Sequence, residues 1–142
     1  MNAAAYAFEV DPSRDIIRLK MSGFFSPQDL PGFLEARRAA HARLTCPANA
    51  HLTLNDVRDL KIQSQEMVEA FGQMLSNCSY HARRLAFVVK PGLIRTQVVR
   101  ALAGRDDARS FESIRMAEAW LFSGAAAVRS EPHRHAILRA AF

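Results

Sequence analysis

Segments with the two-residue repeat of a β-strand alternate along the chain with segments that have the repeat of an α-helix. The strand patterns occupy residues 6–10, 16–23, 51–57, 85–89 and 108–111, and the helix patterns occupy residues 27–44, 64–75, 93–102 and 114–121. Helices placed between successive strands favour a parallel sheet with helical cover and right-handed crossovers. The order predicts an α/β fold in which an N-terminal β-hairpin is followed by αβαβαβα, with a single mostly parallel sheet covered by helices.

The hairpin is indicated by two alternating stretches on either side of a turn. Tyr6, Phe8 and Val10 share one face of the first stretch, while the intervening positions are small or charged. Asp11–Asp15 has the composition of a turn, in which Pro12 fixes φ in advance. Both stretches are therefore expected to place one face against a core.

The ends of the first helix follow from its flanking residues. Ser26 and Pro27 are typical of a helix start, and Pro31 leaves open a later start for the regular helix. One stripe of this helix carries Leu30, Phe33, Leu34, Arg37, His41 and Leu44. In the strand that follows, Leu52 and Leu54 are expected to point inward.

A length of 142 residues fits one domain. We expect that domain over residues 5–124, where the strand and helix patterns end. Residues 125–142 are expected to form a C-terminal tail or a short helical extension. The tail contains apolar side chains outside the predicted core, which suggests self-association, with a homodimer as the commonest form.

Composition limits the classes of binding partner and the cellular location that the chain could have. The net charge is +5, from 19 basic and 14 acidic residues, and its scatter is typical of a solvated surface rather than of a nucleic-acid interface. No apolar stretch approaches the roughly 18 residues that cross a bilayer, and the first residues lack the basic region of a secretory signal. Cys46 and Cys78 stand alone. These features predict a cytoplasmic protein that does not span a membrane.

Four blocks of the sequence resemble STAS-type domains, which are named for sulfate transporters and anti-sigma antagonists. The blocks are YAFEVDPSRDIIRLKMSGFFSPQDL, HLTLNDVRDLKIQSQEMVEAF, ARRLAFVV and MAEAWL. More narrowly, the chain is similar to the STAS-like (SpoIIAA-like) bacterial domains of unassigned function. The resemblance covers roughly residues 5–124 and implies the α/β fold given above. It also implies a link, by fold comparison, to carriers of apolar ligands.

The end of the third strand pattern is one candidate site, with Asp56, Arg58, Asp59, Ser64 and Glu66. Ligands of open α/β sheets meet the carboxyl ends of strands, so these residues could bind a partner, or they could form a local ion pair. In phospho-regulated STAS domains a serine near this position is phosphorylated by a partner kinase. Here Ser64 is either that phosphoacceptor or simply a helix cap. The family's Asp-Ser-Ser-Gly type of loop is absent, because this chain reads Ile62-Gln63-Ser64-Gln65.

Large, soft side chains around two helices are a second candidate site. They could line an apolar pocket, or they could be ordinary core beneath the helices. The residues chosen for this pocket are Phe25, Phe33, Met67, Phe71 and Met74.

Other chemistry receives less support from the sequence. Gly-rich nucleotide motifs and the GxSxG motif are absent, and no cofactor or metal site is expected. Asp56 and Lys90 do not make a receiver domain, since no acidic pair follows the first strand. His41 is interpreted as a packing residue, and His51 and His81 have no visible acidic partner. An enzyme is therefore the least supported class.

Arginines around the last crossover give no nucleic-acid site either. The nearest aromatic residue is Phe111, which is expected to point into the core. The arginines concerned are Arg95, Arg100, Arg105 and Arg109. Two hypotheses lead. The chain is a non-enzymatic regulatory module that docks a protein near the third strand, or it carries or senses an apolar ligand held between helices and sheet.

Overall fold

A five-stranded sheet is the framework of residues 3–123, the part of the chain that the computed structural model describes. The elements are β1 (Ala5–Asp11), β2 (Ile16–Gly23), η1 (Pro27–Asp29), α1 (Leu30–His41), β3 (Leu52–Leu60), α2 (Gln65–Leu75), η2 (Cys78–Tyr80), β4 (Arg84–Val88), α3 (Leu93–Ala101), β5 (Ala108–Phe111) and α4 (Ile114–Ser123). The strands lie in chain order; β1 is antiparallel to β2, and the other neighbours are parallel. The predicted α/β fold and its element order are confirmed.

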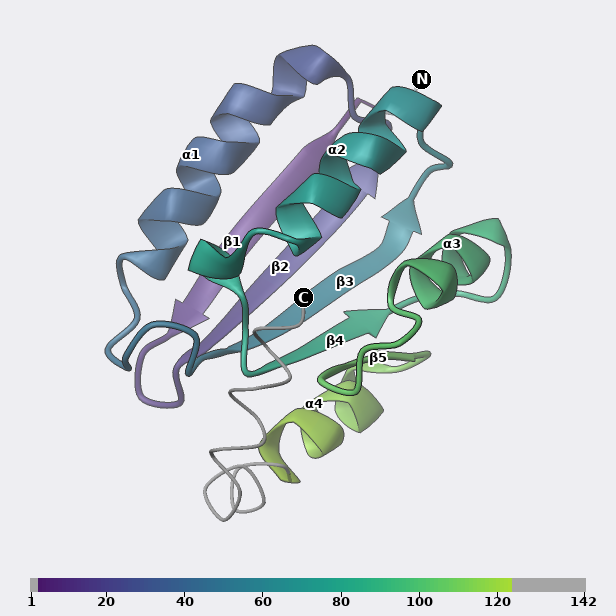
Figure 1. Cartoon of the computed structure of the whole chain (residues 1–142). Helices are drawn as coiled ribbons and strands as arrows, with labels where there is room; N and C mark the ends of the chain where they lie inside the picture. Colours follow the sequence, from purple (N-terminus) through teal and green to yellow (C-terminus); the bar gives the residue numbers. More distant parts are fainter. Residues whose placement is uncertain (1–2, 124–142) are drawn as a thin grey trace.

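The two faces of the sheet receive different helices, because successive residues of a strand point to opposite sides. Helices α1 and α2 lie over one face, and α3 adds Ile94 and Val98 to the core on that side (Figure 1). Helix α4 packs on the other face, where Ala117 and Leu121 are fully buried. Strand β3 is in the middle of the sheet, and both of its faces are covered, because Val57 belongs to the core on one side and Leu52 and Leu54 to the core on the other.

The sequence left two starts open for the first helix, one after Ser26 and one near Pro31, and the structure contains both features. Ser26 precedes a single 3-10 turn, and its backbone N–H donates to the Asp29 carboxylate at 2.8 Å. The regular helix begins at Leu30, with Pro31 in its first turn, where a missing N–H costs nothing. Helix α1 ends at His41, so Leu44 lies beyond it. Leu34 is 38% exposed and leaves the predicted buried stripe.

The third strand is longer than its sequence pattern predicts. The pattern ends at Val57, whereas β3 continues to Leu60. The register with β2 shifts there, because Lys20 pairs with Asp56 but Ser22 pairs with Asp59. A shift of this kind is a β-bulge, and it lets a strand continue after its alternation is broken. The expected inward positions of Leu52 and Leu54 are confirmed, because both are buried.

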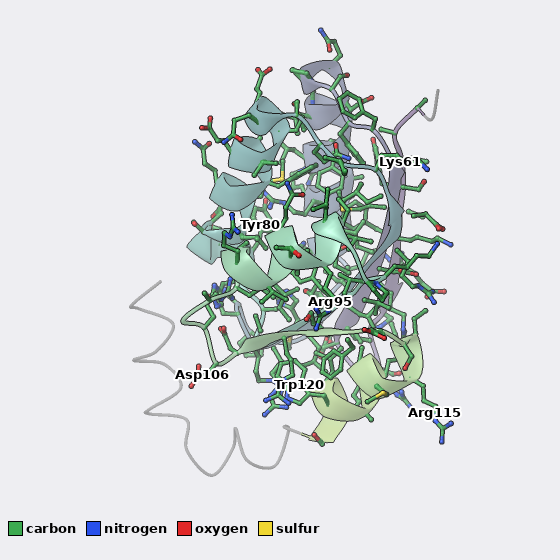
Figure 2. All side chains as sticks on the ribbon, turned by 90° about the vertical axis from the view of Figure 1, so that its right-hand side faces the viewer. Lys61, Tyr80, Arg95, Asp106, Arg115 and Trp120 are labelled. Carbon is green, nitrogen blue, oxygen red and sulfur yellow. The ribbon has the colours of Figure 1, made fainter. Side chains whose placement is uncertain are left out.

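Side chains from the sheet and from the helices fill the space between them on each face of the sheet (Figure 2). The larger core lies on the face covered by α1, α2 and α3 and includes Met21, Phe25 and Phe33. Lys61 follows β3, and Tyr80, which precedes β4, lies on the side of the sheet that α1 and α2 cover (Figure 2).

Candidate functional site

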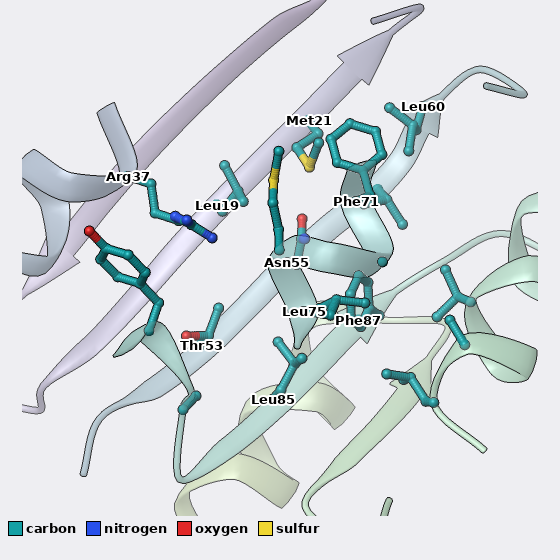
Figure 3. A pocket seen from close by; sticks show the side chains of 18 of the residues that line it. Leu19, Met21, Arg37, Thr53, Asn55, Leu60, Phe71, Leu75, Leu85 and Phe87 are labelled. Carbon is teal, nitrogen blue, oxygen red and sulfur yellow. The ribbon is translucent and has the colours of Figure 1, made fainter. Parts of the chain in front are cut away.

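A pocket of about 230 Å³ lies on the face of the sheet that α1 and α2 cover. We call it the inter-helix pocket. Its walls come from α1, α2, α3 and strands β2, β3 and β4 (Figure 3). Most of its lining is apolar, and this part includes Leu19, Met21, Leu60, Leu75, Leu85 and Phe87. A mostly apolar concavity with a few polar groups is the usual form of a small-molecule site.

Aromatic side chains close one end of the pocket. Helices α1 and α2 meet through Phe33 and Phe71, whose ring centroids are 6.4 Å apart. Phe25 lies beneath them, with ring centroids 5.9 Å from Phe33 and 5.5 Å from Phe71. Of the residues chosen from the sequence, Phe33, Phe71 and Met74 line the pocket. Phe25 and Met67 are fully buried in the adjoining core.

The floor of the pocket includes two polar residues of the central strand, Thr53 and Asn55 (Figure 3). Their neighbours in register are apolar: Asn55 lies between Leu19 and Phe87. The side-chain oxygen Oδ1 of Asn55 is buried and has no hydrogen-bond partner among the described residues. A buried amide oxygen without a donor costs about 1–3 kcal/mol, so its place in this apolar row needs an explanation.

Arg37 and His41 form a polar wall at the α1 side of the pocket. They are four residues apart and so share one face of the helix. The Arg37 guanidinium extends from α1 into the pocket (Figure 3), and its carbon lies 4.2 Å from the ring centroid of Tyr80. The Nε of Arg37 and the Nε2 of His41 are both buried without a hydrogen-bond partner among residues 3–123.

The electrostatics of this wall are those of a cationic group held away from water. Burial lowers the pKa of Arg37 and of His41. The Nδ1 of His41 donates to the backbone carbonyl of Arg37 at 2.9 Å, because a carbonyl oxygen can only accept. In the neutral ring the proton is therefore on Nδ1, and Nε2 presents a lone pair.

A second buried polar cluster joins the segments before β4 and β5. His81 Nε2 donates to the Asp107 carboxylate at 2.7 Å, and Arg105 Nε donates to its other oxygen at 3.1 Å. Burial would raise the pKa of Asp107, but the hydrogen bonds from His81 and Arg105 outweigh it and lower the pKa to about 2. The sequence interpretation that His81 has no acidic partner is wrong, because parallel pairing of β4 and β5 brings these residues together.

The charged residues chosen at the end of the third strand lie within β3 itself. Asp56 is buried, and both of its carboxylate oxygens accept from Arg58, at 2.9 and 2.8 Å. Burial alone would raise the pKa of Asp56, but the pair with Arg58 lowers it. Asp59 lies near two lysine amines, 3.8 Å from Lys20 and 3.6 Å from Lys90. This group therefore forms a network of local ion pairs at the carboxyl ends of the strands.

Ser64 is the N-cap of α2. Its hydroxyl accepts from the backbone N–H of Met67 at 3.2 Å, and Glu66 is exposed in the first turn of the helix.

Gln63, the residue before Ser64, was not chosen from the sequence. Its amide accepts from the Phe25 N–H at 2.9 Å and donates to the carbonyl of Gly23 at 3.1 Å, which ties β2 to the start of α2.

Other candidate sites gain little from the structure. The guanidiniums of Arg84 and Arg109 lie 4.4 and 5.2 Å from the ring centroid of Trp120, and Phe111 packs against the core on the α4 face of the sheet. Within residues 3–123 no group of three or more His, Cys, Asp or Glu side chains could hold a metal ion. No helix in the described part of the chain is long and apolar enough to cross a membrane. The tail at 125–142 lies outside the described residues.

Comparison with known proteins gives the class of fold. No family model matches the chain, and no curated protein matches it. The structure is similar to that of an uncharacterized protein of the DUF3478 family with a SpoIIAA-like fold from Shewanella loihica PV-4. The TM-score is 0.65 at 17% identity, and the match covers 85% of this chain and 95% of that one. The chain has a SpoIIAA-like fold, as its resemblance to these domains implies; at this identity the similarity concerns the fold alone.

Proposed function

We propose that the protein binds a small amphipathic molecule in the inter-helix pocket and acts as a carrier or sensor. The observation that carries the proposal is an apolar pocket bordered by buried polar atoms without partners: Arg37 Nε, His41 Nε2 and Asn55 Oδ1. Each of these groups costs free energy in the empty protein. A bound molecule that supplies the missing partners would recover that cost.

The size of the pocket limits the occupant. An apolar cavity of about 150 Å³ takes benzene, so by proportion about 230 Å³ has room for roughly ten non-hydrogen atoms. A molecule of that size binds with a dissociation constant in the micromolar to millimolar range, at the usual free energy per atom. This affinity suits a sensor of an abundant small molecule.

A matched pair of substitutions on α3 tests the proposal. Val98 lines the pocket, whereas Val99 is 46% exposed. Val98→Trp is expected to fill the pocket and to abolish the binding of octanol measured by titration calorimetry. Val99→Trp is expected to leave binding unchanged. Equal binding by both variants, or no binding of octanol by the unmodified protein, would contradict the proposal.

A second function, docking of a partner protein beside the start of α2, is favoured by a different observation. Ile62 is 53% exposed, next to the exposed cap Ser64 and the ion pairs around Asp59. A phosphate on Ser64 would lie at the positive end of the helix. Mass spectrometry of the protein isolated from its own cells tests this. Phosphate on Ser64 supports the switch, and an unmodified Ser64 under every growth condition sampled contradicts it.

A further inference from the structure

We infer that the occupant of the inter-helix pocket is a small carboxylic acid whose carboxylate lies against the Arg37 guanidinium and whose apolar chain extends toward Met21, Phe71 and Leu75. This inference rests on the proposed function and adds the chemical class of the ligand. It follows from the charge and orientation of the Arg37 side chain and from the unmet hydrogen bond of its Nε.

Arg37 supplies the charge. Within residues 3–123 no Asp or Glu acts on its guanidinium; burial is the main influence on its pKa, and the side chain packs on the ring of Tyr80. A guanidinium stays protonated even when partly buried, because its intrinsic pKa is so high. A half-buried cation without a carboxylate in the described part of the chain is costly, and an anionic ligand would remove that cost. An amine would instead be repelled.

His41 limits the anion to a weakly charged one. Its ring faces Tyr80, at 4.6 Å between centroids, and His51, at 4.9 Å, and burial disfavours its charged form. The wall therefore offers one permanent positive charge, on Arg37. A single carboxylate matches one guanidinium in charge and in its planar, two-oxygen geometry. A phosphate carries more charge than this wall neutralises.

The apolar part of the pocket determines the size and polarity of the rest of the ligand. From Arg37 the lining continues over Leu19 and Thr53 to the side chains of Met21, Phe71 and Leu75 (Figure 3). Room for roughly ten non-hydrogen atoms corresponds to an eight-carbon acid or an aryl acid of similar size. Octanoate is a suitable probe, because octanol and octylamine share its chain and differ only in the polar group.

The experiment compares these three probes on the full chain and on two variants of α1. Arg37→Gln removes the pocket guanidinium. Arg38→Gln removes its neighbour, which is exposed and paired with Glu35 at 2.5 Å. Titration calorimetry is expected to show octanoate binding roughly tenfold or more tightly than octanol, and octylamine most weakly. Arg37→Gln is expected to bring octanoate down to the affinity of octanol, and Arg38→Gln to change neither.

The outcomes separate the inference from the function beneath it. If octanol binds and octanoate binds no better, the pocket takes ligands but the carboxylate inference is wrong. The same holds if Arg37→Gln leaves the preference for octanoate intact. If none of the three probes binds the unmodified protein, both the inference and the proposed function are wrong. Retained octanol binding by Arg37→Gln shows that the variant keeps a folded pocket.

Discussion

Asn55 is the residue at which the stability of this fold and its proposed function pull in opposite directions. Its amide lies on the central strand between Leu19 and Phe87, and its buried oxygen has no donor among the described residues. A leucine would suit that row better in the empty protein. The cost is understandable if the bound molecule carries a hydrogen-bond donor in addition to the carboxylate that Arg37 binds.

Asn55→Leu is therefore expected to stabilise the empty protein. Removing an unsatisfied buried amide and adding apolar contact should raise the free energy of unfolding by about 1 kcal/mol. Urea unfolding measures this change. Asn77→Leu is the control, because the Asn77 amide is exposed and already accepts a hydrogen bond from Ser79. A loss of stability in Asn55→Leu would mean that the amide is satisfied within the protein.

Asp107 gives the described part of the chain a specific dependence on acid. Its pKa is lowered from 3.8 to about 2 in the folded protein, while the unfolded chain keeps the ordinary value. A lowered carboxyl pKa contributes stability above the unfolded pKa, and that contribution is lost as the pH falls through the folded pKa. The contribution is about 2 kcal/mol at neutral pH and disappears between about pH 4 and pH 2.

Asp107→Asn should reveal this contribution. At pH 7 the variant is expected to be less stable than the unmodified protein by about 2 kcal/mol, and the gap should close as the pH falls from about 4 to about 2. Urea unfolding at several pH values measures the gap. Asp106→Asn, at the exposed neighbouring position, should show no such pattern. A gap that stays constant over this range would contradict the assignment of the pKa to the buried cluster.

At the level of elements, two glycines in helices report how closely each helix lies on its neighbours. A Cβ on Gly72 of α2 would meet nothing within 4 Å, whereas a Cβ on Gly32 of α1 would lie 2.8 Å from the hydroxyl of Tyr6. The Tyr6 ring packs against Phe33, with centroids 5.2 Å apart, so it cannot move away without cost. Helix α1 therefore needs glycine where it crosses β1.

The two alanine variants are expected to change stability in opposite directions. Gly72→Ala should raise the free energy of unfolding by about 0.5–1 kcal/mol, because alanine loses less backbone freedom in a helix. Gly32→Ala should lower it by about 1 kcal/mol or more, because the methyl group displaces Tyr6. Chemical denaturation of both variants measures the difference. Equal stabilisation by the two would show that α1 lies farther from β1 than the structure has it.

The helices and strands also show which features of the fold and of the site could be predicted from the sequence. Strand and helix order followed from periodicity, and the capping role that Ser64 has in the structure was one of its two predicted roles, because capping is local chemistry. The polar floor was missed because Leu52 and Leu54 were taken to define the only buried face of their strand. A central strand covered on both sides also places Thr53 and Asn55 beneath helices, where both line the pocket. The polar residues in such a strand were the available signal.

The polar wall was missed for a related reason. Arg37 and His41 were placed on the apolar stripe of their helix, which is correct, yet a cation within an apolar stripe was not treated as a site. Contacts between distant segments gave no sequence signal at all. His81 and Asp107 are 26 positions apart, and only the pairing of β4 with β5 brings them together.

In the described part of the chain, the two faces of the sheet differ in polarity and in packing. The face under α4 is packed with apolar side chains such as Leu54 and Val88. The face under α1 and α2 combines an apolar core with the inter-helix pocket and its polar wall. The central claim, that this pocket binds a small amphipathic molecule, therefore predicts a response confined to one side of the sheet.

Methyl NMR of the full chain titrated with octanoate tests that claim directly. The methyl resonances of Leu19 and Leu85, which line the pocket, are expected to shift progressively and to saturate. Those of Leu54 and Val88, on the opposite face of the sheet, are expected to stay in place. Shifts that are absent from the pocket methyls, or that are as large on the α4 face, would contradict the account.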